Sequence, residues 1–191
     1  MKRNFSLIVL LVISLPVFAQ ITWKADPAHS KLTFSITHLL ISDVAGLFKT
    51  FEATATATKP DFSDAVFELT AQTASVNTEV DKRDGHLRSG DFFEVDKFPA
   101  MTFKSSSIKM VSADKYTLTG NLTLHGVTRP VTMDVWYRGT IQNPMSKAPT
   151  AGFQITGAIK RSDFDFGSKY PAPMLGDEVR IKADGEFVKG K

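Results

Sequence analysis

Apolar and polar residues alternate along most of this 191-residue chain. A β-strand turns successive side chains to opposite faces, so a period of two is typical of strands with one buried face and one wet face. The alternation is clearest over residues 116–124, and it recurs over 32–38, 51–57, 67–72, 131–137, 153–159 and 179–187. A weaker strand is predicted over 101–110. The chain is therefore predicted to be all-β.

About eight long strands with little helix leave two architectures, a sandwich or a closed up-and-down barrel. Short turns containing Gly, Asp or Pro separate the strands, which favours antiparallel neighbours. A barrel also removes the exposed strand edges that a sandwich keeps. We therefore predict an eight-stranded antiparallel β-barrel with one or two short helical segments.

Two segments break the strand pattern. Residues 41–48 are apolar and short, and Ser42 is placed to cap a helical turn there. Residues 79–91 are highly charged, and residues 78–81 resemble a capping box, which predicts a short helix or helical loop. The connection over residues 168–176 is unusually apolar for an exposed loop.

The N-terminus has the pattern of a cleaved signal peptide. Lys2 and Arg3 precede an apolar run over residues 5–13, and Val17-Phe18-Ala19 suits a cleavage site. The run is shorter than the roughly 20 residues that a spanning helix needs, although a retained membrane anchor is the alternative. We expect residues 1–19 to be removed, residues 20–191 to form one barrel domain, and the protein to be periplasmic.

Charge and cysteine content narrow the functional classes. The chain has 23 Lys and Arg against 20 Asp and Glu, and removing Lys2 and Arg3 leaves 21 against 20, a net charge of +1. Such a balance argues against a nucleic-acid partner. The sequence contains no cysteine, so disulfides, thiolate metal sites and thiol catalysis are excluded. An exported chain without disulfides depends on its core for stability.

Small residues are frequent on the faces that we expect to point inward. They would leave apolar volume unfilled, and such a void tends to take up an apolar ligand. The alternative is that Phe and Leu side chains from facing strands fill the space. The small residues are Ala53, Ala55, Ala57, Ala71, Gly120, Gly157, Ala183 and Gly185.

Four sequence blocks, in this order, resemble the YceI family of exported, lipocalin-like proteins. They are Asp-Pro-Ala-His-Ser at residues 26–30, the segment 38–48, the run Arg-Asp-Gly-His-Leu-Arg-Ser-Gly-Asp-Phe-Phe at residues 83–93, and the segment 120–131. The resemblance extends over about residues 21–187. It implies a lipocalin-like barrel of eight antiparallel strands that binds a long isoprenoid chain inside, such as a polyprenyl phosphate or a quinone.

Candidate ligand-binding residues follow from the inward faces and from the charged segment. Arg83, His86 and Arg88 form a candidate headgroup site, because a guanidinium offers two parallel donors to phosphate. The alternative is structural, with Arg83 paired to Asp84 and Arg88 to Asp91. Phe92 and Phe93 are expected to plug the barrel end. The candidate residues inside the barrel are Phe34, Ile36, His38, Ala55, Leu122, Met133, Phe153, Ile155 and Ile181, of which His38 could instead be an ordinary buried histidine.

The sequence shows no signature of a nucleophile elbow or of a phosphate-binding glycine loop, so we expect no catalytic residues and no enzyme. The four histidines lack metal-ligand spacing, so no metal is expected. No cofactor is expected apart from a bound isoprenoid lipid or quinone.

We interpret the chain as an exported binding protein for an apolar or amphiphilic lipid. It would have no stable membrane insertion, with transient membrane contact left open, and could be a monomer or a homodimer. One alternative is a packed barrel that acts through its surface as a stress-related periplasmic partner or inhibitor. A weaker one is a hydrolase or isomerase acting on the lipid.

Overall fold

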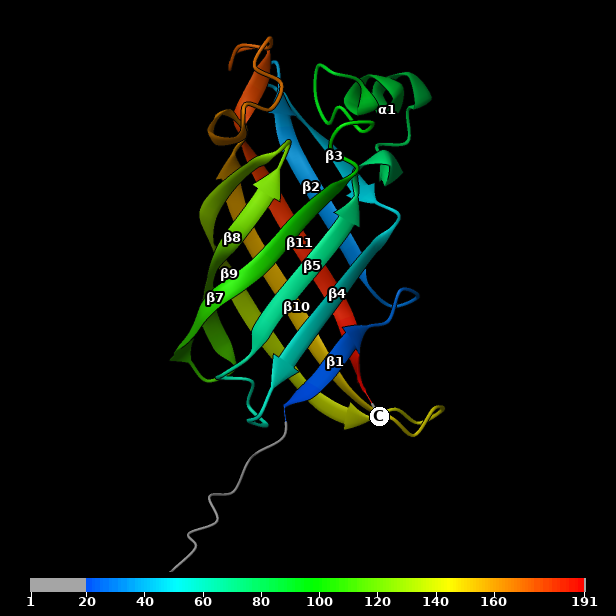
Figure 1. The fold of residues 1–191 in the computed structure, drawn as a ribbon, viewed down its shortest axis with the longest axis vertical. Coiled ribbons are helices and arrows are strands. Elements are labelled where there is room, and N and C mark those ends of the chain that lie inside the picture. Colours follow the sequence, from blue (N-terminus) through cyan, green and yellow to red (C-terminus); the bar gives the residue numbers. More distant parts are fainter. Residues whose placement is uncertain (1–19, 191) are drawn as a thin grey trace, which may run out of the picture.

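Figure 1 shows a closed antiparallel β-barrel with one α-helix above its upper end. This computed structural model describes residues 20–190. The predicted signal peptide at residues 1–19 lies outside the described residues. Within the described part of the chain, no helix is long and apolar enough to cross a membrane.

Eleven strand segments form one sheet. The segments are β1 (Ile21–Ala25), β2 (Lys31–His38), β3 (Ser42–Phe48), β4 (Phe51–Ala57), β5 (Val66–Gln72), β6 (Val76–Asn77), β7 (Ala100–Ser112), β8 (Lys115–Leu124), β9 (Val127–Gln142), β10 (Pro149–Lys160) and β11 (Leu175–Lys189). The helical segments are the 3-10 turns η1 (Thr73–Ser75) and η2 (Arg161–Phe164) and the helix α1 (Asp81–Arg88).

The eleven segments occupy eight positions around the barrel, because three positions each hold two segments in line. β1 pairs with β4 and β11, while β2 pairs with β3 and β11, so β1 and β2 continue one another. In the same way β3 continues into β4, and β5 into β6. The pairing of β1 with β11 closes the ring. The predicted eight-stranded antiparallel barrel is confirmed, and the sandwich alternative is wrong.

The period-two pattern identifies the buried faces correctly. Along β8, Tyr116, Leu118, Gly120, Leu122 and Leu124 are buried, and the residues between them are exposed or half-buried. The weaker prediction over residues 101–110 is also confirmed, because β7 spans that range. Alternation is a reliable guide here because each long strand has one face against the barrel interior and one in solvent.

The helical turn expected after Ser42 is wrong. Residues Ser42–Phe48 form β3, which pairs with β2 along its whole length. Gly46 leaves room for the Phe34 ring over β3, because a Cβ at that position would lie 2.5 Å from this ring. Hydrogen bonding to a neighbouring strand therefore overrides the local capping signal, as tertiary context commonly does.

The charged segment contains the predicted helix, but its start differs from the expected capping box. Val80 is the N-cap of α1 and makes no side-chain capping bond. The Thr78 hydroxyl instead donates to Asp84 Oδ1 at 2.6 Å. Acidic residues in the first turn of α1 and basic residues in the last turn suit the helix dipole.

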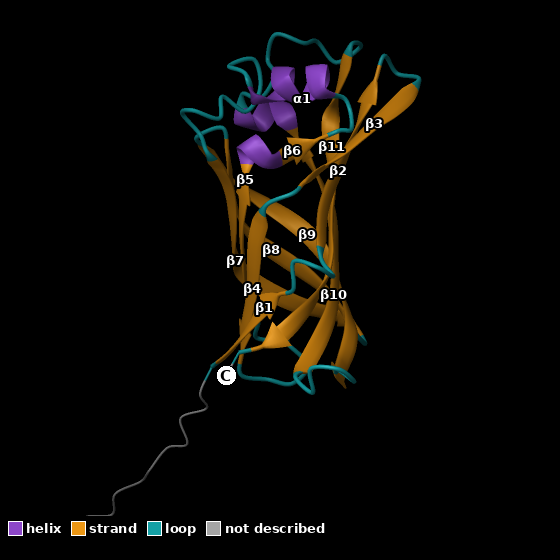
Figure 2. Ribbon diagram, turned by 90° about the vertical axis from the view of Figure 1, so that its right-hand side faces the viewer, coloured by secondary structure: helices purple, strands orange, loops and turns teal. Residues whose placement is uncertain are grey.

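The two ends of the barrel are built differently. At the lower end, the β4–β5 loop folds Phe62 into the base, where the residue is almost fully buried. At the upper end, α1, the β2–β3 hairpin and the segment over residues 165–174, here called the mouth loop, surround the barrel opening (Figures 1 and 2). The lower end is therefore closed by side chains of the core, and the upper end by separate segments.

Candidate ligand-binding cavity

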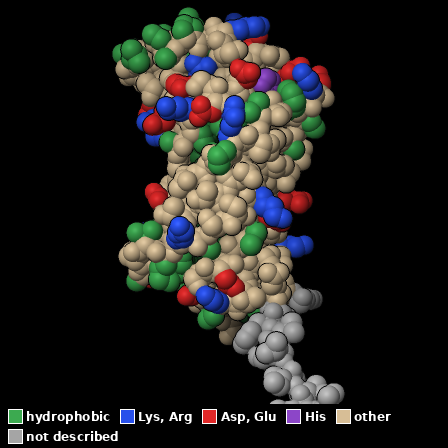
Figure 3. Space-filling model, turned by 60° about the vertical axis from the view of Figure 1, so that its left-hand side comes forward, with side chains coloured by type: hydrophobic (Ala, Val, Ile, Leu, Met, Phe, Trp, Pro, Cys, Tyr) green, Lys and Arg blue, Asp and Glu red, His purple; other side chains and the backbone are tan. Residues whose placement is uncertain are grey.

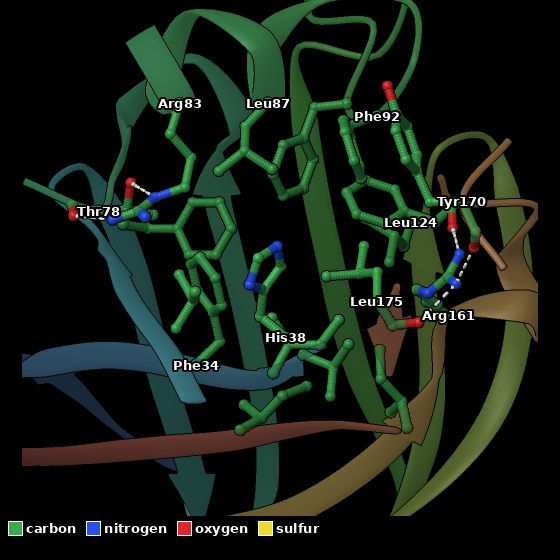
Figure 4. Close-up of a pocket in the computed structure, with 18 of the residues that line it drawn as sticks. Phe34, His38, Thr78, Arg83, Leu87, Phe92, Leu124, Arg161, Tyr170 and Leu175 are labelled. Carbon is green, nitrogen blue, oxygen red and sulfur yellow. Dashed lines mark hydrogen bonds between the residues drawn. The ribbon is translucent and has the colours of Figure 1, made fainter. Parts of the chain in front are cut away.

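A cavity of about 280 Å³ occupies the upper half of the barrel. Its walls come from β2, β3, β10 and β11, and α1 and the mouth loop cover it. Figure 4 shows side chains from these elements converging on one space. The lining residues are Leu32, Thr33, Phe34, Ile36, His38, Val44, Phe48, Thr78, Arg83, His86, Leu87, Phe92, Phe93, Met101, Leu124, Ile159, Arg161, Phe166, Tyr170, Met174, Leu175, Val179 and Ile181.

The cavity wall carries positive charge but no negative charge. Most lining side chains are aliphatic or aromatic, two are arginines, and none is a carboxylate. Arg83 and Arg161 lie on opposite sides of the cavity (Figure 4). An apolar space with cations and no acids in its wall favours a ligand with a long apolar part and an electron-rich or anionic end.

Arg83 is held at the cavity by Thr78. Its Nε donates to Thr78 Oγ1 at 2.7 Å, and its Nη2 donates to the Thr78 carbonyl at 2.8 Å. Asp84, which is buried, fixes Thr78 in turn by accepting from its backbone N–H at 2.8 Å. Among the described residues, Nη1 of Arg83 has no hydrogen-bond partner. The arginine is therefore oriented by two bonds and keeps donors for a ligand.

Arg161 has a different role, because backbone carbonyls use all of its donors. The residue is 5% exposed, and it organises the mouth loop from within. A charged side chain at this depth is tolerated only when it is well hydrogen-bonded. The accepting carbonyls are those of Gly176 for Nε, of Phe166 and Gly167 for Nη1, and of Tyr170 and Leu175 for Nη2. Arg161 thus contributes its charge to the cavity wall and no free N–H.

Aromatic side chains form a roof over the cavity, here called the aromatic roof and made of Phe92, Phe93, Phe166 and Tyr170. Phe92 and Tyr170 are stacked, with ring centroids 5.1 Å apart, and Phe93 packs edge-on to Phe166 at 4.6 Å. Such contacts favour a dry enclosure. Phe92 and Phe93 are both buried at this end of the barrel, which matches the predicted plug.

A polar cluster, here called the clasp, joins α1 and the segment after it to the mouth loop. The clasp consists of His86, Asp91, Lys169 and Tyr170. Asp91 Oδ2 lies 3.0 Å from His86 Nε2 and accepts from the Tyr170 hydroxyl at 3.2 Å, while Lys169 donates to the other carboxylate oxygen. Hydrogen bonds from Lys169 and then His86 lower the pKa of Asp91 to about 2. Partial burial and the Asp91 charge raise the pKa of Tyr170.

Not every predicted headgroup residue faces the cavity. Arg88 donates to the carbonyls of Ala74 and Val76 at 2.8 and 2.9 Å, so it fastens α1 to the barrel wall. Among the described residues, the expected ion pairs Arg83–Asp84 and Arg88–Asp91 do not form. Arg83 bonds Thr78 instead, and Arg88 bonds two backbone carbonyls. Arg83 and His86, in contrast, both line the cavity.

The candidate residues inside the barrel divide between two spaces. Phe34, Ile36, His38 and Ile181 line the upper cavity. Met133, Phe153 and Ile155 line a smaller lower cavity of about 80 Å³, together with Ile181 and Leu32, which line both spaces. Ala55 and Leu122 are buried but line neither cavity. His38 is exposed at the end of β2, so the expectation of an ordinary buried histidine is wrong.

Large side chains occupy the space next to several of the small inward residues. A Cβ at Gly120 would lie 2.6 Å from the Phe103 ring, and one at Gly157 would collide with the Met133 sulfur. The lower half is filled by an aromatic cluster, in which Phe153 is central. The ring pairs are Trp23–Phe62, Phe62–Phe153, Phe67–Phe153, Tyr137–Phe153 and Phe153–Phe187. The lower half is therefore mostly packed and keeps only the small cavity of about 80 Å³, whereas the upper half holds the cavity of about 280 Å³.

Sequence reasoning missed Arg161 and the mouth loop as parts of the cavity. A signal was present, because Arg161 continues the inward alternation of Phe153, Ile155, Gly157 and Ile159. An arginine in phase with a buried strand face needs internal partners. The apolar composition of residues 168–176 was a second signal, since exposed loops seldom carry it.

No three His, Asp or Glu side chains gather as a metal-binding group in the described residues 20–190. Arg83 keeps Nη1 without a partner among the described residues, whereas Nε2 of His86 already contacts Asp91 and the Tyr170 hydroxyl.

Comparisons with known proteins agree with this architecture. Residues 23–187 match the model of the YceI-like domain family. A UPF0312 protein of Staphylococcus aureus is 38% identical over 166 residues, covering 85% of this chain and 94% of the relative. The solved YCEI protein of Campylobacter jejuni is 33% identical and has a TM-score of 0.74, covering 82% of this chain and 91% of that chain. A polyisoprenoid binding domain from Saccharophagus degradans shares the fold at 16% identity, with a TM-score of 0.65 over 89% of this chain and 98% of that chain.

Proposed function

The chain belongs to the YceI-like family, and we propose that it holds an isoprenoid lipid, either a polyprenyl phosphate or a quinone, in its upper cavity. The observation that carries the proposal is the composition of the wall, which combines aliphatic and aromatic side chains with two arginines and no carboxylate. The related fold of a polyisoprenoid binding domain supports the same ligand class.

The volume of the cavity sets the length of chain that it can enclose. An engineered apolar cavity of about 150 Å³ binds benzene, so the upper cavity of about 280 Å³ has room for roughly two such six-carbon groups. Each buried CH₂ contributes about 0.8 kcal/mol, so about ten buried carbons give about 8 kcal/mol before ordering costs. A longer chain would extend past Leu32 and Ile181 toward the lower cavity, or out of the mouth.

The polar end of the ligand would lie against Arg83. Nη1 of this residue has no hydrogen-bond partner among the described residues, and no lining carboxylate competes for it. A guanidinium held in place by Thr78 donates to a phosphate or quinone oxygen without first reorganising. Arg161 adds positive charge from the opposite side. The hollow upper half favours ligand binding over action through the outer surface alone.

We further propose that residues 1–19 direct export and are removed, which leaves a barrel domain over residues 20–191 in the periplasm. The basic start, the short apolar run and the small-residue cleavage pattern support this proposal. Mass spectrometry of the periplasmic protein should give a chain that begins at Gln20. A periplasmic chain that retains residues 1–19 would contradict the proposal.

The binding proposal is tested by organic extraction of the purified protein, followed by mass spectrometry of the extract. We expect an isoprenoid in about equimolar amount with wild-type protein. The control is a Val44→Phe variant, because Val44 lines the upper cavity and the larger side chain would occupy ligand space. Absence of isoprenoid from wild-type extracts, or equal amounts from both proteins, would reject the proposal.

A further inference from the structure

The tip of the β2–β3 hairpin exposes three consecutive large apolar side chains. Leu39 is 50% exposed, Leu40 70% and Ile41 84%. The three residues, here called the hairpin tip, lie at the upper end, where the hairpin flares away from the barrel (Figure 2). Contiguous apolar residues in water are unfavourable, and on a folded protein they commonly mark a contact surface.

The backbone at the hairpin tip adds a second, independent observation. Leu39 and Leu40 both have positive φ, 52° and 62°, and the Ile41 N–H donates to the His38 carbonyl at 3.2 Å. Two successive left-handed residues make a hairpin turn whose preferred sequence is Asn-Gly. Bulky residues in this conformation are strained, and such strain is typically kept where it serves a function. The chain thus places leucines where both solvent and backbone disfavour them.

The hairpin tip is continuous with the upper cavity. The Leu39 N–H donates to the Met174 carbonyl at 3.1 Å, and His38 is the register partner of Leu175. His38, Met174 and Leu175 all line the cavity, and Met174 is itself 46% exposed. An apolar surface therefore runs from the hairpin tip over the mouth loop to the cavity.

The size and charge of the hairpin tip indicate its partner. Residues 39–42 carry no charge, and Asp43, the first charged residue after them, is paired with Arg180. A stable protein interface usually takes 20–30 residues on each side, far more than three side chains at a protruding turn supply. An uncharged apolar point of this size suits the edge of the hydrocarbon layer of a membrane.

We propose that the hairpin tip inserts into the surface of a lipid membrane and places the mouth of the barrel against the lipid phase. This inference rests on the proposed function and extends it, because the lipid ligand could then move between membrane and cavity without crossing water. The inserted residues would be Leu39, Leu40 and Ile41, with Met174 at the boundary. The contact would be reversible, since three side chains bury little area.

The opposite end of the barrel provides a matched control. Met110 and Val111, beside the β7–β8 turn, are 53% and 70% exposed, which is close to the values at the hairpin tip. Figure 3 shows hydrophobic side chains gathered at both the upper and the lower end of the molecule. Only the upper group adjoins the cavity of about 280 Å³.

The test measures flotation of the mature protein with neutral phosphatidylcholine vesicles. The main variant carries Leu39→Asn and Leu40→Gly, which give the turn its preferred residues while removing two apolar side chains. We expect about a hundredfold loss of vesicle binding, since two leucines are removed and each buried leucine contributes about tenfold to partition. We also expect the Tm to rise by about 2–4 °C, because backbone strain is relieved. The Met110→Ser, Val111→Ser control should float like the wild type.

Vesicle binding that is unchanged in the hairpin variant, or lost in the lower-end control instead, would overturn the proposal. So would a wild-type dimer that becomes monomeric in the hairpin variant without any vesicle binding, because the partner would then be a second copy of the chain. Extraction of the same samples separates the two proposals. If isoprenoid is bound but the protein does not float, only the membrane contact is refuted. If the protein floats but carries no isoprenoid, the proposed function is refuted and the membrane contact stands.

Discussion

Replacing Arg83 by Gln should weaken the binding of a polyprenyl phosphate far more than that of a quinone. Arg83 lines the cavity and has donors left after its two bonds to Thr78. A charge-assisted hydrogen bond contributes about 1.5–3 kcal/mol, so losing one lowers affinity about 10- to 150-fold. A neutral quinone oxygen forms no ion pair with the guanidinium, so its bond lies at the lower end of this range, about 1.5 kcal/mol, which corresponds to about 12-fold.

Arg88→Gln is the matched control for this substitution. Arg88 also makes two hydrogen bonds, to the carbonyls of Ala74 and Val76, but it does not line the cavity. Both variants should therefore lose a similar amount of stability, about 1–3 kcal/mol for two bonds. Only the Arg83 variant should lose phosphate affinity strongly.

The assay is a titration of delipidated protein with a polyprenyl phosphate and with a quinone of equal chain length, at a temperature where both variants remain folded. Unfolding in urea measures the loss of stability separately. Equal losses of phosphate affinity in the Arg83 and Arg88 variants would refute the headgroup role. Equal losses for phosphate and quinone in the Arg83 variant would refute it as well.

Two further predictions concern packing and pH. Val44→Phe should fill cavity space and leave the Tm within a few degrees of wild type, whereas Gly157→Phe should unfold the barrel more readily in a melting experiment, because it overpacks Met133. The pKa of Asp91 is lowered from its ordinary value near 3.8 to about 2. The ionised carboxylate should therefore stabilise the fold at pH values above about 4, and this contribution should be lost as the pH falls from about 4 to 2. Asp91→Asn should flatten the dependence of Tm on pH in this range, and an unchanged slope would exclude the clasp as its origin.

The sequence was sufficient to predict the barrel, because its strands are long and amphipathic and each keeps one face in water. Alternation along Tyr116, Leu118 and Leu122 corresponds directly to burial. The segment Ser42–Phe48 was mistaken for a helical turn because its pairing partner, β2, is what makes it a strand. Local patterns cannot report such a partner.

The candidate site was predictable only in part, for a geometric reason. Periodicity tells which side chains point inward, but it does not tell at which height of the barrel the interior is empty. Phe34 and Ile36 therefore line the upper cavity, whereas Phe153 belongs to the aromatic cluster that packs the lower half. Arg88 was grouped with Arg83 by nearness in sequence, although the two side chains leave α1 toward different partners.

Photo-crosslinking with an isoprenoid phosphate of about fifteen carbons, carrying a diazirine at its apolar end, tests the central claim most directly. We expect one crosslink per protein, on the peptides of β2 or β11 that contain Leu32 and Ile181, because these residues lie at the deep end of the upper cavity. Excess unlabelled lipid and the Val44→Phe variant should both abolish it. Crosslinks on the outer face of the barrel, or unchanged labelling of the Val44→Phe protein, would contradict the claim that the upper cavity holds the lipid.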